Sequence, residues 1–298
     1  MQLISSTFPW KPLVIMPVGD IQWFGDDHEV ALDKLRKHIL WGVQQGAWFV
    51  GMGDYIDAFS PSNRQRLKSA GLYDNANRIV DRAAVDLVDQ LYDKALKPSE
   101  GRWLGLLAGH HFADLRDGTT TDQYLAHKLK TNHLGDCAYI RLVFKRPAPQ
   151  TSGSGEVLIW CHHGEGSGQS AAAPVQKLER LPATWEGDIF LMGHQSKIAV
   201  APVDRCFPVW PQANGVQQPQ LFYRTVILCG TGSFMKGYVE GRYEGQTPRG
   251  TYIEKRMLRP VSLGSPVITV TPRYKDTPRD GGKRPRTKVW LPDIRVSV

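Results

Sequence analysis

The chain has 298 residues and a mass of 33.4 kDa, and 41% of its residues are hydrophobic and 22% charged. This composition is typical of a globular protein with a hydrophobic core and excludes a disordered chain. No apolar run reaches the roughly 20 residues that a transmembrane helix needs. The N-terminus lacks the pattern of a secretory signal, so we expect a cytoplasmic protein. The four cysteines form no CxxC pair, and we expect them to be reduced core residues: Cys137, Cys161, Cys206 and Cys229.

The net charge of +8 is concentrated toward the end of the chain. Residues 261–298 contain eight Lys or Arg and three Asp, a net +5, mostly within RYKDTPRDGGKRPRTK (273–288). This Pro- and Gly-rich segment is either a loop that contacts phosphate groups or a solvated loop that keeps the protein soluble.

The apolar pattern alternates between strands and helices in the first half of the chain. In chain order, the predicted elements are a strand at 13–18, a helix at 29–46, a strand at 47–52, helical segments at 62–97 interrupted near Gly71 and ended by Pro98, a strand at 103–108, a helix near 121–131, strands at 138–145 and 156–161, a short helix near 174–181, and strands at 188–193, 197–203, 221–229, 266–271 and 289–298. This order predicts an α/β fold in which two mixed β-sheets pack as a sandwich flanked by helices.

The Gly/Ser/Pro-rich stretch 147–155 lies between two predicted strands and is typical of a surface loop. We therefore predict a single domain over residues 1–298. Its core motifs lie in 13–235, and residues 236–298 form a strand-rich extension that carries the basic loop.

Five apolar runs are each followed by Asp or His, usually after a glycine. These residues are Asp20, Asp54, His110 with His111, His162 with His163, and His194. Ligands of open α/β sheets bind outside the carboxyl ends of the strands. Each residue alone is more often a helix cap or a hydrogen-bonded structural residue. Five in one topological position would gather carboxylates and imidazoles that repel or stay unpaired in the absence of a cation.

One or two divalent metal ions would resolve this conflict. Mixed Asp and His ligands suit Mn, Fe or Zn better than Ca or a thiolate-bound zinc. Glycines before the ligands allow sharp turns and close approach of a substrate. The run HHGEGSGQS (162–170) either lines a phosphate pocket with backbone N–H groups or is a flexible loop.

The order of the motifs resembles the five blocks of the calcineurin-like metallophosphoesterases. The matching motifs are GDIQ (19–22), GDYID (53–57), GHHF (109–112), HHG (162–164) and GHQS (193–196). They span about 60% of the chain. Together with KLERL, DIFLMGH and GTGSFMKGY, the HHG motif resembles a subgroup often encoded by phages. The resemblance implies a four-layer fold with two mixed sheets between helices.

The resemblance also implies a role for each matched residue. Asp20 and Gln22 would bind a first metal ion, and Asp54 would bridge both ions. The second ion would be bound by His110, by His194 and by either His162 or His163. We favour His162, which follows the strand directly, although the alternation of side chains along a strand leaves His163 open. His111 would protonate the leaving group.

Four positions depart from the family pattern. Gln22 and Ser196 replace histidines, His110 replaces an asparagine, and Phe112 replaces an acid. The hydroxyl of Ser196 is a poor ligand, so we expect the first metal site to be weaker than the second. Gln195 and His163 are the candidates that would complete it.

These roles imply a metal-dependent phosphoesterase that hydrolyses a phosphomonoester or phosphodiester by a metal-activated hydroxide. We expect two divalent ions, with manganese first and zinc, iron, cobalt, nickel or magnesium as alternatives. The basic charge and Trp23, Phe24 and Phe112 favour a nucleotide or nucleic-acid substrate, although packing is the commoner role of such aromatics. The alternative is a non-catalytic or single-metal protein that binds nucleic acid or phosphate. No membrane partner is expected, and the oligomeric state is left open.

Overall fold

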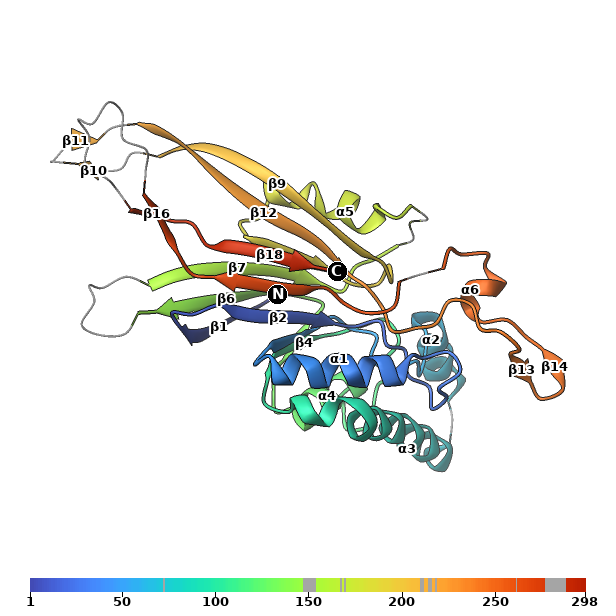
Figure 1. Cartoon of the computed structure of the whole chain (residues 1–298). Helices are drawn as coiled ribbons and strands as arrows, with labels where there is room; N and C mark the ends of the chain where they lie inside the picture. Colours follow the sequence, from blue (N-terminus) through green and yellow to red (C-terminus); the bar gives the residue numbers. More distant parts are fainter. Residues whose placement is uncertain are drawn as a thin grey trace.

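The computed structural model describes residues 1–71, 73–146, 154–166, 168, 170–209, 212–213, 216–217, 219–260, 262–276 and 288–298. Two six-stranded mixed sheets pack face to face, and helices cover their outer faces (Figure 1). This confirms the predicted α/β sandwich. The greater part of the basic segment 273–288 and of the stretch 147–155 lies outside the described residues.

The first sheet carries parallel strands at its centre. In spatial order its strands are β18 (Asp293–Ser297), β15 (Val267–Thr271), β2 (Leu13–Val18), β3 (Trp48–Gly51), β4 (Trp103–Leu107) and β5 (His133–Gly135). Strands β2 to β5 are parallel, whereas β15 is antiparallel to both β2 and β18. Ile268 of β15 lies opposite Ile15 of β2, so the predicted C-terminal extension contributes strands to the same sheet as the first core motif.

The second sheet mixes both strand directions. Its strands in spatial order are β1 (Gln2–Pro9), β6 (Cys137–Lys145), β7 (Ser154–His162), β8 (Ile189–Met192), β12 (Gln220–Thr231) and β9 (Ile198–Val209). Strands β7, β8 and β12 are parallel neighbours. Three two-stranded ribbons complete the strands: β10 (Gln212–Ala213) with β11 (Val216–Gln217), β13 (Tyr243–Glu244) with β14 (Thr247–Pro248), and β16 (Tyr274–Asp276) with β17 (Lys288–Trp290).

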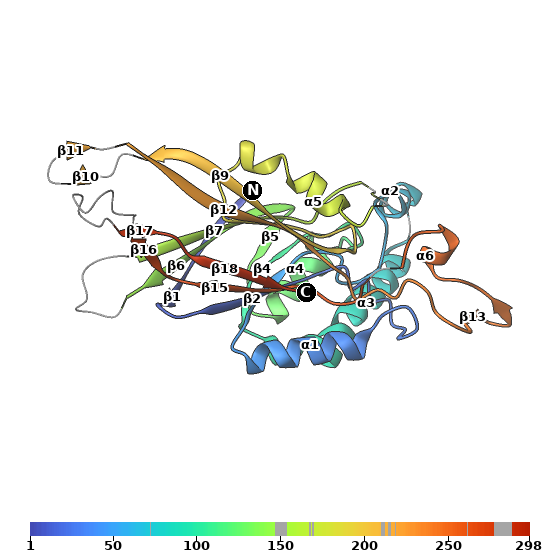
Figure 2. The same cartoon turned by 45° about the horizontal axis from the view of Figure 1, so that its top comes forward.

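Most helices lie on the first sheet, and α5 lies on the second (Figures 1 and 2). The helical elements are α1 (Leu32–Gln44), α2 (Pro61–Ala70), α3 (Asp74–Leu91), the π-helical turn η1 (Tyr92–Leu96), the 3₁₀ turn η2 (Lys97–Ser99), α4 (Thr121–Lys128), α5 (Ala173–Leu178), the 3₁₀ turn η3 (Leu181–Ala183) and α6 (Tyr252–Lys255). Among the helices of the described residues, none has the length and apolar character needed to cross a membrane.

Three apolar clusters fill the spaces between the four layers. The cluster between the sheets includes the fully buried Ile15, Val50 and Ile159. A second cluster lies between the first sheet and its helices, and a third packs Phe190 against Leu178 of α5. Burial of one such side chain contributes roughly 1.5–3 kcal/mol. The sheets therefore form a rigid support for the residues at their strand ends.

The predicted interruption of the helical segments near Gly71 is confirmed, because Gly71 has a φ of 61° and ends α2 in the left-handed conformation. Other element boundaries differ from the predictions. The predicted strands 197–203 and 221–229 pair with each other and extend to Val209 and Thr231. Strand β1 was not predicted. Cys161 and Cys229 are buried as expected, whereas Cys137 is half-buried and Cys206 is exposed, and all four thiols are free.

Candidate metal centre

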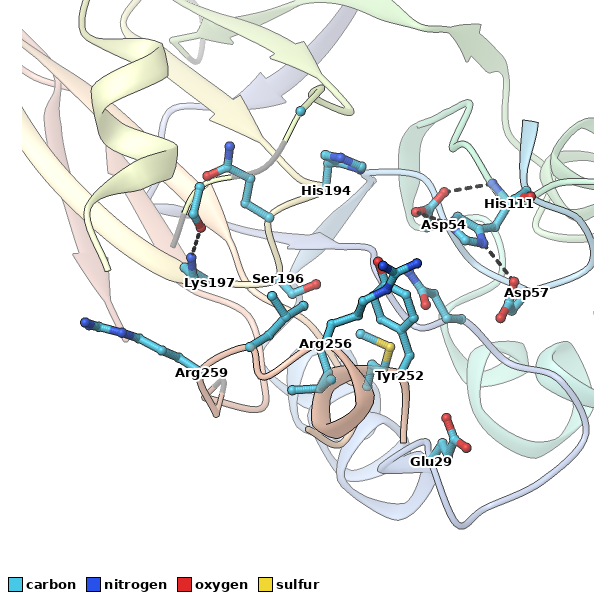
Figure 3. A pocket seen from close by; sticks show the side chains of 18 of the residues that line it. Glu29, Asp54, Asp57, His111, His194, Ser196, Lys197, Tyr252, Arg256 and Arg259 are labelled. Carbon is cyan, nitrogen blue, oxygen red and sulfur yellow. Dashed lines mark hydrogen bonds and ion pairs between the residues drawn. The ribbon is translucent and has the colours of Figure 1, made fainter. Parts of the chain in front are cut away.

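The residues predicted from the strand ends come together at one edge of the sandwich. Asp20 follows β2, Asp54 follows β3, His110 and His111 follow β4, and His194 follows β8. They lie beside a cavity of about 530 Å³ whose lining includes side chains of Asp54, His111 and His194 (Figure 3). This size is in the range of ligand pockets, so the site has room for more than a single phosphate group.

The backbone of the site is strained at the positions expected to bind metal. Of the seven non-glycine residues with positive φ in the described chain, five belong to the predicted site: Asp20 (48°), Gln22 (53°), Asp54 (54°), His194 (64°) and Ser196 (51°). This conformation costs a non-glycine residue roughly 1–2 kcal/mol. Strain of this kind clusters at functional sites.

Backbone N–H groups fix one oxygen of each buried carboxylate and leave the other facing the cluster. Asp54 Oδ1 accepts hydrogen bonds from the N–H groups of His110 and His111, the latter at 3.1 Å. Asp20 Oδ2 accepts from the N–H of His194 at 2.9 Å. The remaining Asp20 Oδ1 is buried and has no hydrogen-bond partner among the described residues. An unpaired buried carboxylate oxygen is costly, and a cation would satisfy it.

Two glycines allow the loops of the site to approach this closely. A Cβ at Gly109 would lie 2.0 Å from the backbone nitrogen of Asp54, and a Cβ at Gly53 would lie 2.6 Å from Nδ1 of His163. Gly53 also has a φ of 91°. The glycines of the sequence motifs therefore serve the contacts between ligand residues.

His163 has one ring nitrogen fixed and the other free to bind an ion. Its Nδ1 lies 2.6 Å from the carbonyl oxygen of Met52. Because a carbonyl only accepts, Nδ1 carries the proton of the neutral ring, and Nε2 presents its lone pair. Nε2 is buried, lies 3.4 Å from Asp54 Oδ2, and has no hydrogen-bond partner within the described part of the chain. A backbone carbonyl that orients a ligand imidazole in this way is common at metal sites.

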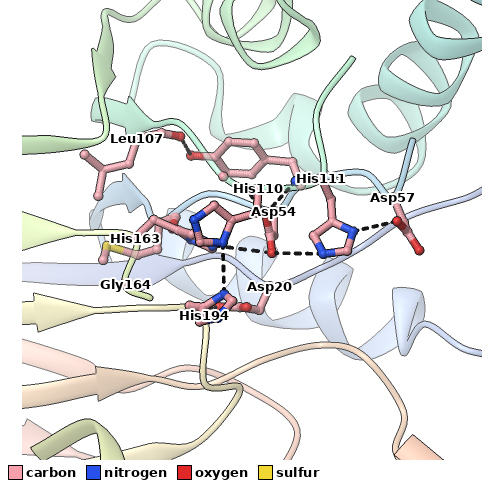
Figure 4. Close-up of polar contacts among 12 residues, drawn as sticks. Asp20, Asp54, Asp57, Leu107, His110, His111, His163, Gly164 and His194 are labelled. Atoms are coloured by element: carbon pink, nitrogen blue, oxygen red, sulfur yellow. Dashed lines mark hydrogen bonds and ion pairs between the residues drawn. The ribbon is translucent and has the colours of Figure 1, made fainter. Parts of the chain in front are cut away.

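The donor atoms form two groups, each with its atoms within 4.8 Å of one another. One group is His110, His163 and His194, and the other is Asp20, Asp54 and His163 (Figure 4). Nδ1 of His110 lies only 3.2 Å from Nδ1 of His194. Two imidazoles face each other at this distance when they share a proton or a cation. The two groups, joined at His163, therefore fit a pair of divalent ions.

The pKa values show how tightly these groups are coupled. Burial raises the pKa of Asp20 to about 7. Burial also works to raise the pKa of Asp54, but the close contact with His163 and the charge of its ring outweigh burial and lower that pKa. Burial alone would lower the pKa of His163, yet its contacts with Asp54 and Asp20 raise it to about 9. Burial and the charges of His163 and His110 lower the pKa of His194 to about 4. A proton on His163 therefore takes the position that a metal ion would occupy.

The structure places His163, and not the favoured His162, in both donor groups. Side chains alternate along a strand, and Cys161 of β7 points into the core between the sheets. The side chain of His163, two residues after Cys161, lies on the same inner face. His162 lies on the outer face, where its ring stacks on Trp160 with centroids 5.9 Å apart and its Nδ1 accepts the N–H of Gly164 at 2.7 Å. The geometry therefore favours His163, the alternative that the sequence left open, over His162.

His111 lies beside the donor groups and forms a pair with a carboxylate that the sequence analysis did not assign. Its Nδ1 is 2.7 Å from Oδ1 of Asp57, and its Nε2 is 4.0 Å from Oδ2 of Asp54. Burial lowers the pKa of His111, but the hydrogen bond to Asp57 and the charges of both aspartates raise it overall. Asp57 is the last residue of GDYID, and its place in that motif was the available signal.

The other residues considered as metal ligands lie along the wall of the cavity. These residues are Gln22, Ser196 and Gln195. Gln195 is buried, and both polar atoms of its amide lack a hydrogen-bond partner among the described residues. Of the glycine-rich run, Gly166 and Gly168 line the cavity.

Only one of the three aromatic residues considered for substrate binding lines the cavity. That residue is Phe24. Trp23 is fully buried in the core beneath the helices, and the ring of Phe112 is covered by the guanidinium of Arg64 at 3.8 Å. Trp23 and Phe112 are therefore packing residues.

No protein-family model matches the chain, and no similar protein was found among curated proteins or solved structures.

Proposed function

We propose that the protein is a metal-dependent phosphoesterase of the calcineurin-like type. The observation that carries this proposal is the juxtaposition of two donor groups, joined at His163, with the His111–Asp57 pair at one cavity. Resemblance of the sequence motifs to the family blocks supports the same reaction. The mixed Asp and His donors suit Mn, Fe, Zn, Co or Ni, with manganese favoured where oxygen donors predominate.

The chain divides its donors between two sites. Asp20 and Asp54 would hold the first ion, and His110, His163 and His194 the second, with Asp54 and His163 close to both. Divalent ions bound there neutralise phosphate charge and lower the pKa of water. The N–H groups that hold Asp54 and Asp20 keep both carboxylates oriented toward the cluster.

His111 is the residue that would supply a proton to the leaving group. Asp57 holds Nδ1, so Nε2 is the nitrogen that carries the transferable proton on the side of Asp54. The raised pKa keeps the ring protonated over a wider pH range than that of a free histidine. General acid catalysis of this kind contributes roughly 10²–10⁴-fold in rate.

His111→Ala is expected to slow hydrolysis of esters with poor leaving groups by about 10²-fold or more, with little effect on nitrophenyl esters. Metal content should stay normal.

Asp57→Asn should lower the pKa of His111, so the alkaline limb of the pH–rate profile should move to lower pH. Steady-state kinetics with both ester types test this, and His127→Ala on the exposed side of α4 is the control. Equal losses for good and poor leaving groups would contradict the role of His111 as acid.

A rival proposal is a binding protein that retains one metal ion. It is motivated by Gln22 and Ser196, which stand where the family pattern has imidazoles. Turnover decides between the two proposals. We expect the purified protein to hydrolyse bis(p-nitrophenyl) phosphate with added Mn, Co, Ni, Zn or Mg. One ion per chain and no turnover with any of these metals would favour the rival.

Metal titration is expected to reveal two unequal sites. In metal-stripped protein the first ion should bind at least about tenfold more weakly than the second, because fewer imidazoles reach it. Activity should rise with added manganese as this weaker site fills. The double change Gln22→His and Ser196→His should tighten it. Calorimetric titration of both proteins, followed alongside hydrolysis, measures the effect. Two equally tight sites in the natural protein would refute the argument.

A further inference from the structure

The cavity has a second wall that faces the candidate metal centre. It is formed by residues 236–260, which contain β13, β14 and α6 and which we call the α6 arm. The arm projects from one end of the sandwich (Figure 1). Figure 3 shows Tyr252 and Arg256 on the arm's side of the cavity, and Asp54 and His111 on the other. The arm would therefore contact a substrate that fills the cavity.

The arm is strongly basic. It contains six Lys or Arg and three Glu. The carboxylate of Glu254 accepts the N–H of Val239 at 2.9 Å. Glu29, which also lines the cavity, forms a half-buried ion pair with Arg242 that anchors the arm to the loop before α1. The charge of Glu29 is thus already paired with that of Arg242.

Three cations line the cavity without a carboxylate partner in the described structure: Lys197, Arg256 and Arg259. The ammonium of Lys197 donates to the carbonyl oxygens of Gly168 and Ser170. Burial, followed by the charge of Arg259, lowers the pKa of Lys197, which shows that these positive charges act on one another. Like charges gathered in a cavity in this way attract a multivalent anion.

An exposed aromatic residue accompanies the arginines. Tyr252 is 56% exposed, lines the cavity, and has the guanidinium of Arg256 5.7 Å from its ring centroid. Tyrosine next to unpaired arginines is typical of surfaces that stack bases and hold backbone phosphates of single strands. The cavity volume of about 530 Å³ also exceeds what a lone phosphate group requires.

We propose that the α6 arm binds a second phosphate of the substrate through Arg256 and Arg259, and that the substrate is a single-stranded polynucleotide. This inference rests on the proposed phosphoesterase activity for the identity of the first phosphate. Arg256 and Arg259 hold the neighbouring phosphate, and Tyr252 stacks on a base. The arm only binds the strand, and the candidate metal centre would cleave the ester bond of the first phosphate.

The test compares the natural protein with the double variant Arg256→Ala, Arg259→Ala. The first readout is binding of a fluorescein-labelled oligothymidylate to metal-stripped protein, measured by anisotropy over a range of salt concentrations. We expect the Kd to rise about tenfold or more. The slope of log K against log salt should become shallower by about 0.7, because the double variant loses one phosphate contact and each such contact on a single strand contributes about 0.7. Lys255→Ala, which removes a charge of α6 outside the cavity lining, is the control for Arg256→Ala.

The second readout is kinetic and separates this inference from the proposed activity. The double variant should lose kcat/KM for the oligothymidylate by about tenfold, whereas hydrolysis of bis(p-nitrophenyl) phosphate should be unchanged. Unchanged oligonucleotide binding, or equal losses with both substrates, would overturn the role of the arm. Absence of turnover with both substrates in the natural protein would refute the phosphoesterase proposal alone, since the anisotropy measurement still decides whether the arm binds a strand.

Discussion

Asp54→Asn is expected to reduce turnover to the background rate and to remove most of the bound metal. The amide retains an oxygen that accepts the N–H groups of His110 and His111, but it loses the negative charge that faces His163. Because Asp54 lies in one donor group and contacts a member of the other, both metal sites should weaken. Metal content per chain, measured on the purified variant, is the direct test.

The control for this change is Asp33→Asn, which removes an exposed carboxylate from α1. It should leave metal content and turnover unchanged. The stripped Asp54→Asn variant should also be less stable than stripped natural protein, because breaking a buried ion pair costs about 3–5 kcal/mol. Chemical denaturation measures that difference. A folded Asp54→Asn variant with full metal content would show that Asp54 does not bridge the ions.

Replacing each of the neighbouring histidines in turn should give opposite results. His163→Ala is expected to lower the affinity of both metal sites, because His163 belongs to both donor groups. His162→Ala should leave metal content and turnover close to those of the natural protein, since its ring stacks on Trp160 outside the cluster. Calorimetric titration of the two stripped variants compares them directly. Loss of metal in His162→Ala with full binding in His163→Ala would reverse our assignment.

The same titration should also depend on pH, because His163 and Asp20 must both lose their protons to bind an ion. A proton on Nε2 competes with the ion, and the pKa of His163 in the stripped protein is raised to about 9. Metal affinity should therefore increase as the pH rises toward about 9 and should level off above it. In the stripped protein the Asp54–His163 pair stabilises the fold below about pH 6.5, and that contribution is lost as the pH rises through about 9.

Periodicity and apolar runs were sufficient to predict the two sheets and the edge at which the site lies. Buried parallel strands such as β2 are continuous apolar runs, so they stand out in the sequence. Strand β1 was missed because its side chains alternate between exposed and partly buried, which weakens the apolar signal. The extension of β9 and β12 depends on their pairing with each other and therefore on tertiary structure.

Within the site, the sequence predicted which strand ends meet but not which side chain of a pair faces inward. His162 and His163 point to opposite faces of β7, and the packing of the two sheets decides which of these faces turns inward. The pairing of His111 with Asp57 was missed for a related reason, since it depends on the close approach of two loops. The α6 arm has no strong pattern of its own, and its place beside the cavity follows from contacts such as Arg242 with Glu29.

The position of β15 also determines when the metal centre can form during synthesis of the chain. Asp20 follows β2, and β15 completes the sheet beside β2 from a point about 250 residues later in the chain. The carbonyl oxygen of Asp20 accepts the hydroxyl of Ser233 at 2.8 Å, and its carboxylate accepts the N–H of His194. The earliest ligand is therefore held by segments that leave the ribosome late. Contacts this distant in sequence form slowly, so the donor groups of the candidate metal centre come together only when nearly the whole fold is in place.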